Sequence, residues 1–372
     1  MESNNNIRIL NGSLLFDENL ELIEEGFIVI ENGKIVEIGD GFEKGGEVFE
    51  NCLIMSSLIN SHVHLGDSFA KDSILGMNVR GAVGKKGIKW KLYKTAKRDE
   101  IIKGIQDSIL YMTISGTTSF AEFREFGLEG LQIFWESLEK LKIGVKPIVL
   151  AREIKESDPK LKFHGFGLNL YHLESIDESF KKLCKDKFLV VHAGECPNEV
   201  SRLLDIIDDA NIKVDAIVHA TKATDCELEE ISKRRISVIL CPRSNLTLRV
   251  GIPNVAKMLE HKINVCLGTD NVMITPPNMF RELEFLSRLI YLQDPDVSSK
   301  EILKIASVNP AKLFDLDHGT IKVGNSADLI IVDMNSVNLR NTKDMFATIA
   351  TRVEPFNIKK IIVNGEDITL KI

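Results

Sequence analysis

The sequence predicts an α/β protein: a (β/α)8 TIM-like barrel with a small β-sandwich domain built from both chain ends. Short apolar runs alternate with stretches of helical period through the middle of the chain, which is typical of parallel βαβ units. Eight such runs fall within about 265 residues, close to the usual length of one closed barrel. The two chain ends contain short β-like runs instead, and each is too short to bury a core alone.

The predicted small domain combines residues 1–54 with residues 321–372. Asn-Gly pairs at 32–33 and 364–365 favour tight hairpin turns, because both residue types tolerate a positive φ. The strands expected at the two ends are Ile7–Phe16, Gly26–Ile30, Ile35–Ile38, Leu329–Val332 and Ile361–Val363.

The predicted barrel covers residues 55–320. Its expected strands lie in the runs Leu53–Asn60, Thr117–Glu122, Val145–Glu153, Gly165–Leu170, Phe188–Glu195, Ala216–Thr221, Ser237–Asn245 and Ile263–Asn271. Helical stretches between them include Asp99–Thr113, Leu128–Leu141, Ile176–Cys184, Asn198–Asp208 and Glu227–Lys233. An open doubly wound sheet is the rival architecture, but when it binds nucleotide it usually has a Gly-rich turn after its first strand. No GxGxxG follows the first run, so the barrel is favoured.

Composition narrows the classes of function. A formal net charge of −7 argues against a nucleic-acid partner, which usually needs a basic domain. No apolar run reaches about 18 residues, so no membrane span is expected. The start, MESNNNIRIL, lacks the basic and apolar regions of a secretory signal, which favours a cytoplasmic protein. The six cysteines contain no CxxC pair and are interpreted as free thiols.

Polar residues gather where the expected strands end. The first run leads into His62-Val63-His64, and residues two apart on a strand point to the same face. His192, His219 and Asp270 close three later runs, and Glu195 follows His192. Barrel active sites lie at the carboxyl ends of the strands, and imidazole is a ligand for zinc, copper, iron or nickel. The pattern therefore predicts a metal site. The other four histidines (His164, His172, His261, His318) are interpreted as structural or surface residues.

These motifs, in this order, resemble the amidohydrolase superfamily over nearly the whole chain. The narrower resemblance is to the branch that holds cytosine deaminase, adenosine-homologue deaminases, guanine deaminase and triazine hydrolases. It rests on HVH at 62–64, HAGE at 192–195, the lone His219, CPRSN at 241–245, GTDN at 268–271, VNPA at 308–311 and GNSADL at 324–329. Ser56-Ser57 replaces the usual Pro-Gly, and the segment after the first strand does not resemble the loop of well-known nucleoside deaminases.

The resemblance implies a set of roles. His62, His64, His192 and Asp270 would hold one divalent metal ion, zinc first and iron second, with a water of lowered pKa as nucleophile. Asp270 would accept the proton of that water, His219 would polarise the substrate, and Glu195 would protonate a ring nitrogen and then the leaving group. No lysine closes the third or fourth run, which favours one metal over two and leaves Glu153 as the remaining bridging candidate.

Three hypotheses of function follow. The first is hydrolytic deamination of a nucleobase, nucleoside or related nitrogen heterocycle. The second is hydrolysis of a cyclic amide or imidazolone ring, similar to imidazolonepropionase. The third is a non-catalytic scaffold, which usually lacks metal ligands, whereas none is missing here. The expected partner is a small heterocyclic substrate, and the resemblance is compatible with a homo-oligomer.

The sequence leaves the role of two groups of charged residues open. Eight basic residues and no acid lie between Arg80 and Arg98, together with Trp90 and Tyr93. They form either a solvated face or a cover near the site whose positive field favours an anionic substrate. Residues 122, 124, 152 and 153 (Glu, Arg, Arg and Glu) follow strand ends and are either ion pairs at the rim or substrate contacts.

Overall fold

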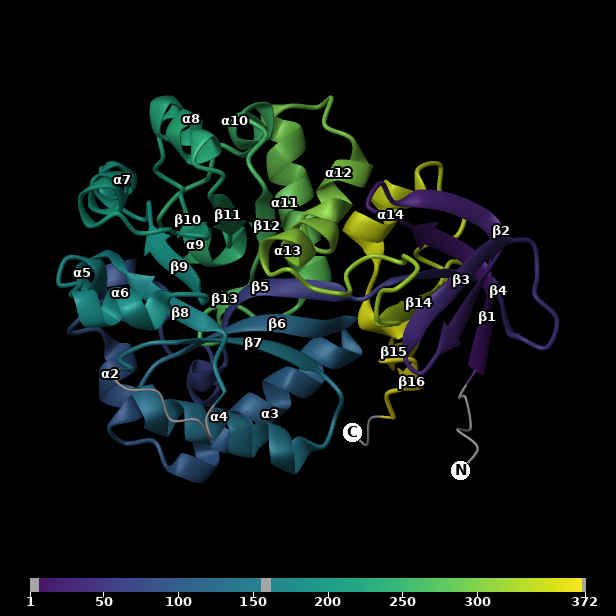
Figure 1. Ribbon diagram of the computed structural model, residues 1–372, viewed down its shortest axis with the longest axis horizontal. Coiled ribbons are helices and arrows are strands. Elements are labelled where there is room, and N and C mark those ends of the chain that lie inside the picture. Colours follow the sequence, from purple (N-terminus) through teal and green to yellow (C-terminus); the bar gives the residue numbers. More distant parts are fainter. Residues whose placement is uncertain (1–6, 155–161, 370–372) are drawn as a thin grey trace.

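A computed structural model describes residues 7–154 and 162–369, and shows a barrel beside a second sheet (Figure 1). The barrel strands are β5 (Leu58–His64), β6 (Thr117–Arg124), β7 (Lys146–Ala151), β8 (Gly165–Asn169), β9 (Phe188–Ala193), β10 (Ala216–His219), β11 (Ser237–Leu240), β12 (Val265–Leu267) and β13 (Asp270–Asn271). They pair in parallel in chain order from β5 to β12. β13 then pairs with β5, Asp270 opposite Val63, so the sheet closes on itself. The predicted TIM-like barrel is confirmed.

The first predicted run, Leu53–Asn60, is wrong as a single strand. It spans the end of β4 (Glu47–Ser56), which belongs to the second sheet, and the start of β5. The chain changes sheet at Ser57, whose N–H donates to Asp328 O at 3.0 Å, while Leu58 N–H donates to Gly116 O at 2.9 Å. All residues from Cys52 to His64 are buried, so apolar pattern alone does not mark this change.

The second sheet joins the two ends of the chain. It contains β1 (Ile7–Phe16), β2 (Glu21–Glu31), β3 (Lys34–Asp40), β4, β14 (Leu329–Asp333), β15 (Ile358–Val363) and β16 (Glu366–Asp367). Its order is β16-β15-β14-β4-β1-β2-β3, and β4 pairs antiparallel with β14. In Figure 1 the yellow strands from the end of the chain lie beside the purple strands from its start. The sheet curls until Ala327 N–H donates to Gly33 O at 2.9 Å, enclosing a small apolar core. Both Asn-Gly turns have the positive φ angles that the sequence predicts.

Helices surround the barrel. The longer ones are α3 (Arg98–Ile114), α4 (Gly127–Leu141), α7 (Glu199–Ala210), α8 (Asp225–Lys233), α11 (Met279–Gln293) and α14 (Met345–Arg352). The shorter ones are α1 (Val79–Ala82), α2 (Ile88–Tyr93), α5 (Leu170–Leu173), α6 (Glu178–Cys184), α9 (Pro242–Thr247), α10 (Val255–Glu260), α12 (Ser299–Lys304), α13 (Val308–Leu313) and the 3-10 turns η1 (Leu65–Ala70) and η2 (Pro355–Asn357). Each of the five predicted helical stretches overlaps one of them, namely α3, α4, α6, α7 and α8. The start of helix α8 is fixed by its local sequence, because Thr224 and Glu227 form a capping box there.

Two structural features place the mouth of the barrel. Apolar side chains fill the interior, and the Phe123 ring meets the His62 ring edge-on, with centroids 4.1 Å apart. After β5, the segment from η1 to α2 covers the carboxyl ends of the strands. Tyr93 on α2 packs against Phe69 and Phe126, with ring centroids 5.0 and 4.6 Å apart. The Arg80–Arg98 segment therefore lies near the mouth, which agrees with the second of the two alternatives that the sequence left open, although most of its basic side chains are exposed.

Two earlier expectations concern the chain as a whole. Within residues 7–154 and 162–369, no helix has the length and apolar character needed to cross a bilayer. The expectation about a secretory signal falls largely on residues 1–6, which lie outside the described ranges. The boundaries at 54/55 and 320/321 stay a prediction.

Candidate metal centre and active site

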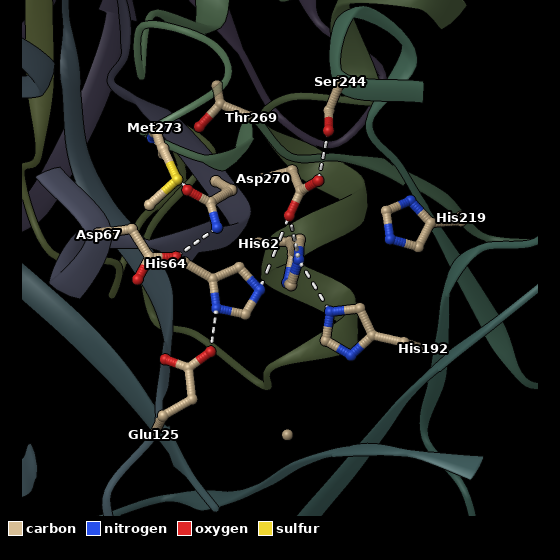
Figure 2. Close-up of polar contacts among 12 residues, drawn as sticks. His62, His64, Asp67, Glu125, His192, His219, Ser244, Thr269, Asp270 and Met273 are labelled. Atoms are coloured by element: carbon tan, nitrogen blue, oxygen red, sulfur yellow. Dashed lines mark hydrogen bonds and ion pairs between the residues drawn. The ribbon is translucent and has the colours of Figure 1, made fainter. Parts of the chain in front are cut away.

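Three histidines and an aspartate converge at the mouth (Figure 2). His62 and His64 come from the end of β5, His192 from β9 and Asp270 from β13. The Nε2 atom of His62 lies 3.2 Å from His192 Nε2 and 3.2 Å from Asp270 Oδ1. His64 Nε2 lies 3.7 Å from the same Asp270 oxygen. The structure thus brings together the four residues that the sequence proposes as metal ligands.

The three distances given above suit ligands of one cation. His62 belongs to two candidate metal-binding groups of the described residues, one with His64 and Asp270 and one with His192 and His219. Ligands about 2.0–2.1 Å from a tetrahedral zinc ion lie about 3.3 Å from one another. Burial lowers the pKa of His62 to about 3 and holds that of His192 well below its ordinary value, so both rings are neutral, the form that binds metal. Burial opposes ionisation of Asp270, but its hydrogen bond with His62 and the nearby histidines keep its pKa well below the usual value.

Outer partners orient three of the four side chains. His192 Nδ1 lies 3.1 Å from Leu168 O, and His64 Nδ1 lies 3.1 Å from Glu125 Oε1. A proton on each Nδ1 leaves Nε2 free to face the centre, which is how metal-binding histidines are usually held. Ser244 Oγ donates to Asp270 Oδ2, leaving Oδ1 toward the histidines. These contacts favour a pre-arranged donor set.

The backbone at the centre is tightly constrained. A Cβ atom at Gly268 would lie 2.6 Å from His62 Cβ, so only glycine allows the end of β12 to approach β5 this closely. Asp270 and His219 have φ angles of 59° and 79°, a left-handed conformation that is unusual outside glycine. Strain of this kind concentrates at functional sites.

Glu195 and His219 lie next to the donor set. His219 Nε2 is 3.8 Å from Glu195 Oε1, and His219 Nδ1 is buried without a hydrogen-bond partner among the described residues. Burial raises the pKa of Glu195, which favours its protonated form. The turn that carries Glu195 is held by Glu199, whose Oε2 accepts the N–H groups of Gly194, Glu195 and Cys196 at 2.9, 2.9 and 3.0 Å. Neither Glu199 nor its role was predicted, although a carboxylate four residues after Glu195 was visible in the sequence.

A cavity of about 410 Å³ opens onto these residues. Of the predicted site residues, all but the fully buried His62 line it. Its walls include the rings of Trp90, Phe126 and Tyr171, and the charged side chains of Lys85, Arg152 and Glu153. Lys85 Nζ lies 4.8 Å from the centroid of the Tyr171 ring, across the opening. None of the four histidines interpreted as structural lines the cavity.

Several charged residues lie elsewhere than expected. Glu122 and Arg124 are fully buried and lie 3.5 Å apart, so they are not ion pairs at the rim; burial raises the pKa of Glu122 to about 8. Lys89, one of the eight basic residues at the mouth, is buried as well. Its partners are Asp67 and Glu125, neither of which the sequence predicted; Glu125, which directly follows Arg124, was the visible signal. Glu153 lies on the cavity wall and is absent from the candidate metal-binding groups of the described residues.

Comparison with known proteins agrees with this architecture. A 5-methylthioadenosine/S-adenosylhomocysteine deaminase of Clostridium tetani is 29% identical over 395 residues, covering 94% of this chain and 90% of its own. A putative aminohydrolase of Methanothermobacter thermautotrophicus is 28% identical over 397 residues, covering 97% and 99%. The crystal structure of an adenosine deaminase from Xanthomonas campestris with bound zinc superposes with a TM-score of 0.82 at 18% identity, covering 96% of this chain and 92% of that chain.

The comparison with protein families is decisive for classification. Residues 150–368, more than half of the chain, match the profile of the Amidohydrolase family. The chain therefore belongs to the amidohydrolase family.

Proposed function

We propose that the protein is a metal-dependent hydrolytic deaminase of a nitrogen heterocycle, and that His62, His64, His192 and Asp270 hold one divalent ion. The observation that carries this proposal is the approach of three imidazole Nε2 atoms and one carboxylate oxygen beside the cavity: His62 Nε2 lies 3.2 Å from both His192 Nε2 and Asp270 Oδ1, and His64 Nε2 lies 3.7 Å from that oxygen. Zinc is the preferred ion, because neutral imidazole and carboxylate suit it and the structurally similar adenosine deaminase contains it.

The bound ion would supply a water molecule whose pKa is lowered toward about 7, which makes it a nucleophile at neutral pH. Asp270, ionised within the histidine cluster, is placed to accept the proton of the attacking water. His219 faces the cavity from β10 and would stabilise negative charge that develops on the substrate. Glu195, with its raised pKa, would donate its proton to a ring nitrogen, take up the proton of the hydroxyl group added to the ring, and pass that proton to the leaving amino group, which departs as ammonia; the proton accepted by Asp270 would then restore Glu195.

The substrate that we infer is an adenosine-like nucleoside. The support is the name of the Clostridium tetani relative, a deaminase of 5-methylthioadenosine and S-adenosylhomocysteine, which aligns over most of both chains. A cavity of about 410 Å³ has room for a nucleoside, and its aromatic walls suit a flat ring.

Metal analysis and ammonia release test this function together. The purified protein should contain about one zinc or iron ion per chain and release ammonia from adenosine, 5-methylthioadenosine or S-adenosylhomocysteine. A chelator should abolish the activity, and zinc should restore it. Two tightly bound ions per chain would contradict the single-metal site. Ring opening of an imidazolone or cyclic amide, with no ammonia from nucleosides, nucleobases or pterins, would replace deamination by the alternative hydrolase.

A further inference from the structure

Lys89 differs from the other basic residues at the mouth. The remaining seven between Arg80 and Arg98 are exposed, whereas Lys89 on α2 is only 3% exposed. Its Nζ lies 2.8 Å from Asp67 Oδ2 and 2.7 Å from Glu125 Oε1. Burial opposes the charged form, but the two carboxylates raise the pKa of Lys89 above its ordinary value, so the ammonium stays charged. A buried ion pair of this kind is costly to break from one side.

The carboxylate that holds Lys89 also holds His64. Glu125 Oε1 lies 2.7 Å from Lys89 Nζ and 3.1 Å from His64 Nδ1, so one oxygen atom contacts both side chains (Figure 2 shows its contact with His64). The contact with Lys89 is a hydrogen bond, whereas the contact with His64 has ion-pair distance without hydrogen-bond geometry. Arg152 Nη1 lies farther from the same oxygen, at 3.7 Å, and Glu125 Oε2 has no hydrogen-bond partner among the described residues. The orientation of Glu125 therefore depends chiefly on Lys89.

We propose that Lys89 is a positioning residue that couples the mouth segment, residues 79–97, to the metal ligand His64 through Glu125. The inference rests on the metal site proposed above. A cation at His64 Nε2 polarises the ring, which strengthens the contact between Nδ1–H and Glu125 and thereby fixes the acceptor of Lys89. Coupling is reciprocal, so docking of α2 on Lys89 strengthens metal binding by the same factor as metal binding strengthens docking.

Other contacts of α2 should keep this helix folded and in place when Lys89 is replaced, so the coupling can be tested without unfolding the segment. Trp90 and Tyr93 pack on Phe126, with ring centroids 6.0 and 4.6 Å away, and Trp90 Nε1 donates to Gly84 O at 2.8 Å. These contacts do not involve Lys89. Lys89→Met keeps most of the length of the side chain and removes its charge. Lys91→Met removes an exposed charge from the same helix and is the matched control.

Two measurements test this proposal. The first is hydrogen exchange of residues 79–97 in the full chain, measured after the metal has been removed and again after zinc has been added back. The second is the zinc affinity, measured by competition with a chromophoric chelator. In the wild type, zinc should slow exchange in this segment. Lys89→Met should lose that zinc-dependent protection and bind zinc about 10- to 100-fold more weakly, the usual loss for an outer partner of a metal ligand. Lys91→Met should behave as the wild type.

Two results would overturn the inference while leaving the metal site intact. One is stoichiometric zinc binding by the wild type with unchanged exchange in residues 79–97, an outcome that no variant is needed to observe. The other is wild-type zinc affinity and protection in Lys89→Met. If Lys89→Met does not fold, Glu125→Gln, which keeps the oxygen and removes its charge, is judged by the same two measurements. A wild type that binds no zinc would overturn the proposed function and the coupling together.

Discussion

Glu199 offers a sharp test of how the turn after β9 positions the proposed acid. One carboxylate oxygen accepts three successive N–H groups, those of Gly194, Glu195 and Cys196. Glu199→Ala removes all three bonds at once. Glu199→Gln keeps an acceptor oxygen in the same place and removes only its charge, so the two variants separate the geometry of the turn from its electrostatics.

The size of the effect follows from the burial of the three donors. Cys196 is exposed, so water can replace its bond, while Gly194 is buried and Glu195 is largely covered. Hydrogen bonds to charged acceptors contribute about 1.5–3 kcal/mol each, and two of them at the lower limit give about 3 kcal/mol. A loss of this size lowers the population of the native turn up to about 100-fold, since 1.36 kcal/mol is a factor of ten. We expect kcat of Glu199→Ala to fall about 10- to 100-fold.

Metal content is the internal control. His192 precedes the turn and is held by pairing with Asn169 and Val218 on the neighbouring strands, and by Leu168 O. Glu199→Ala should therefore keep its metal. In Glu199→Gln the turn should persist and kcat at low pH should stay near the wild type. Besides burial, the negative charge of Glu199 raises the pKa of Glu195. Glu199→Gln removes this charge and should lower that pKa, so the loss of activity with rising pH should begin at a lower pH than in the wild type.

The measurements are ammonia release across pH and elemental analysis of each variant. Wild-type kcat in Glu199→Ala would refute the positioning role. So would loss of metal in proportion to loss of activity, because the damage would then lie at His192 and not at Glu195.

Three further predictions concern metal content and turnover, substrate binding, and thermal stability. Glu195→Gln should keep the metal and lose about 10²- to 10⁴-fold in turnover, as expected for a general acid–base group, whereas His62→Ala should lose the metal itself; a Glu195→Gln variant with near-normal turnover would remove Glu195 from the mechanism. Because Lys85 lines the cavity, Lys85→Met should raise KM for a substrate that carries a carboxylate or phosphate, and this increase in KM should become smaller as the salt concentration rises. Lys86, which is exposed and does not line the cavity, supplies the control variant Lys86→Met. Equal kinetics in the two variants would favour a solvated face without a role in substrate binding. In the folded protein the pKa of Glu122 is about 8 against an ordinary 4.5, so the stability that its bound proton contributes is lost as pH rises through that window. The difference in Tm between Glu122→Gln and the wild type should therefore grow in favour of the variant from pH 5 to pH 9. A difference in Tm that stays constant over this range would contradict the raised pKa of Glu122.

The sequence was sufficient for those features that depend on local order along the chain. Alternation of apolar runs and helical stretches predicted the barrel, and Asn-Gly pairs predicted the turns of the terminal sheet. The ends of parallel strands meet at one face of a barrel, so His62, His64, His192 and Asp270 could be placed together before any coordinates were known. The likeness to amidohydrolases rested on these residues together with other short motifs, such as CPRSN at 241–245 and GNSADL at 324–329.

Tertiary structure decided which charges are buried and which oxygen each donor meets. The sequence does not distinguish Lys89 from the seven exposed basic residues around it, because burial of an ammonium depends on Asp67 and Glu125, which are distant in sequence. Nor does it show the change of sheet at Ser57, since both sides of that step are apolar. Periodicity reports the environment of a residue along its own strand or helix, whereas ion pairs, shared hydrogen bonds and sheet membership are set by segments that meet only when the chain folds.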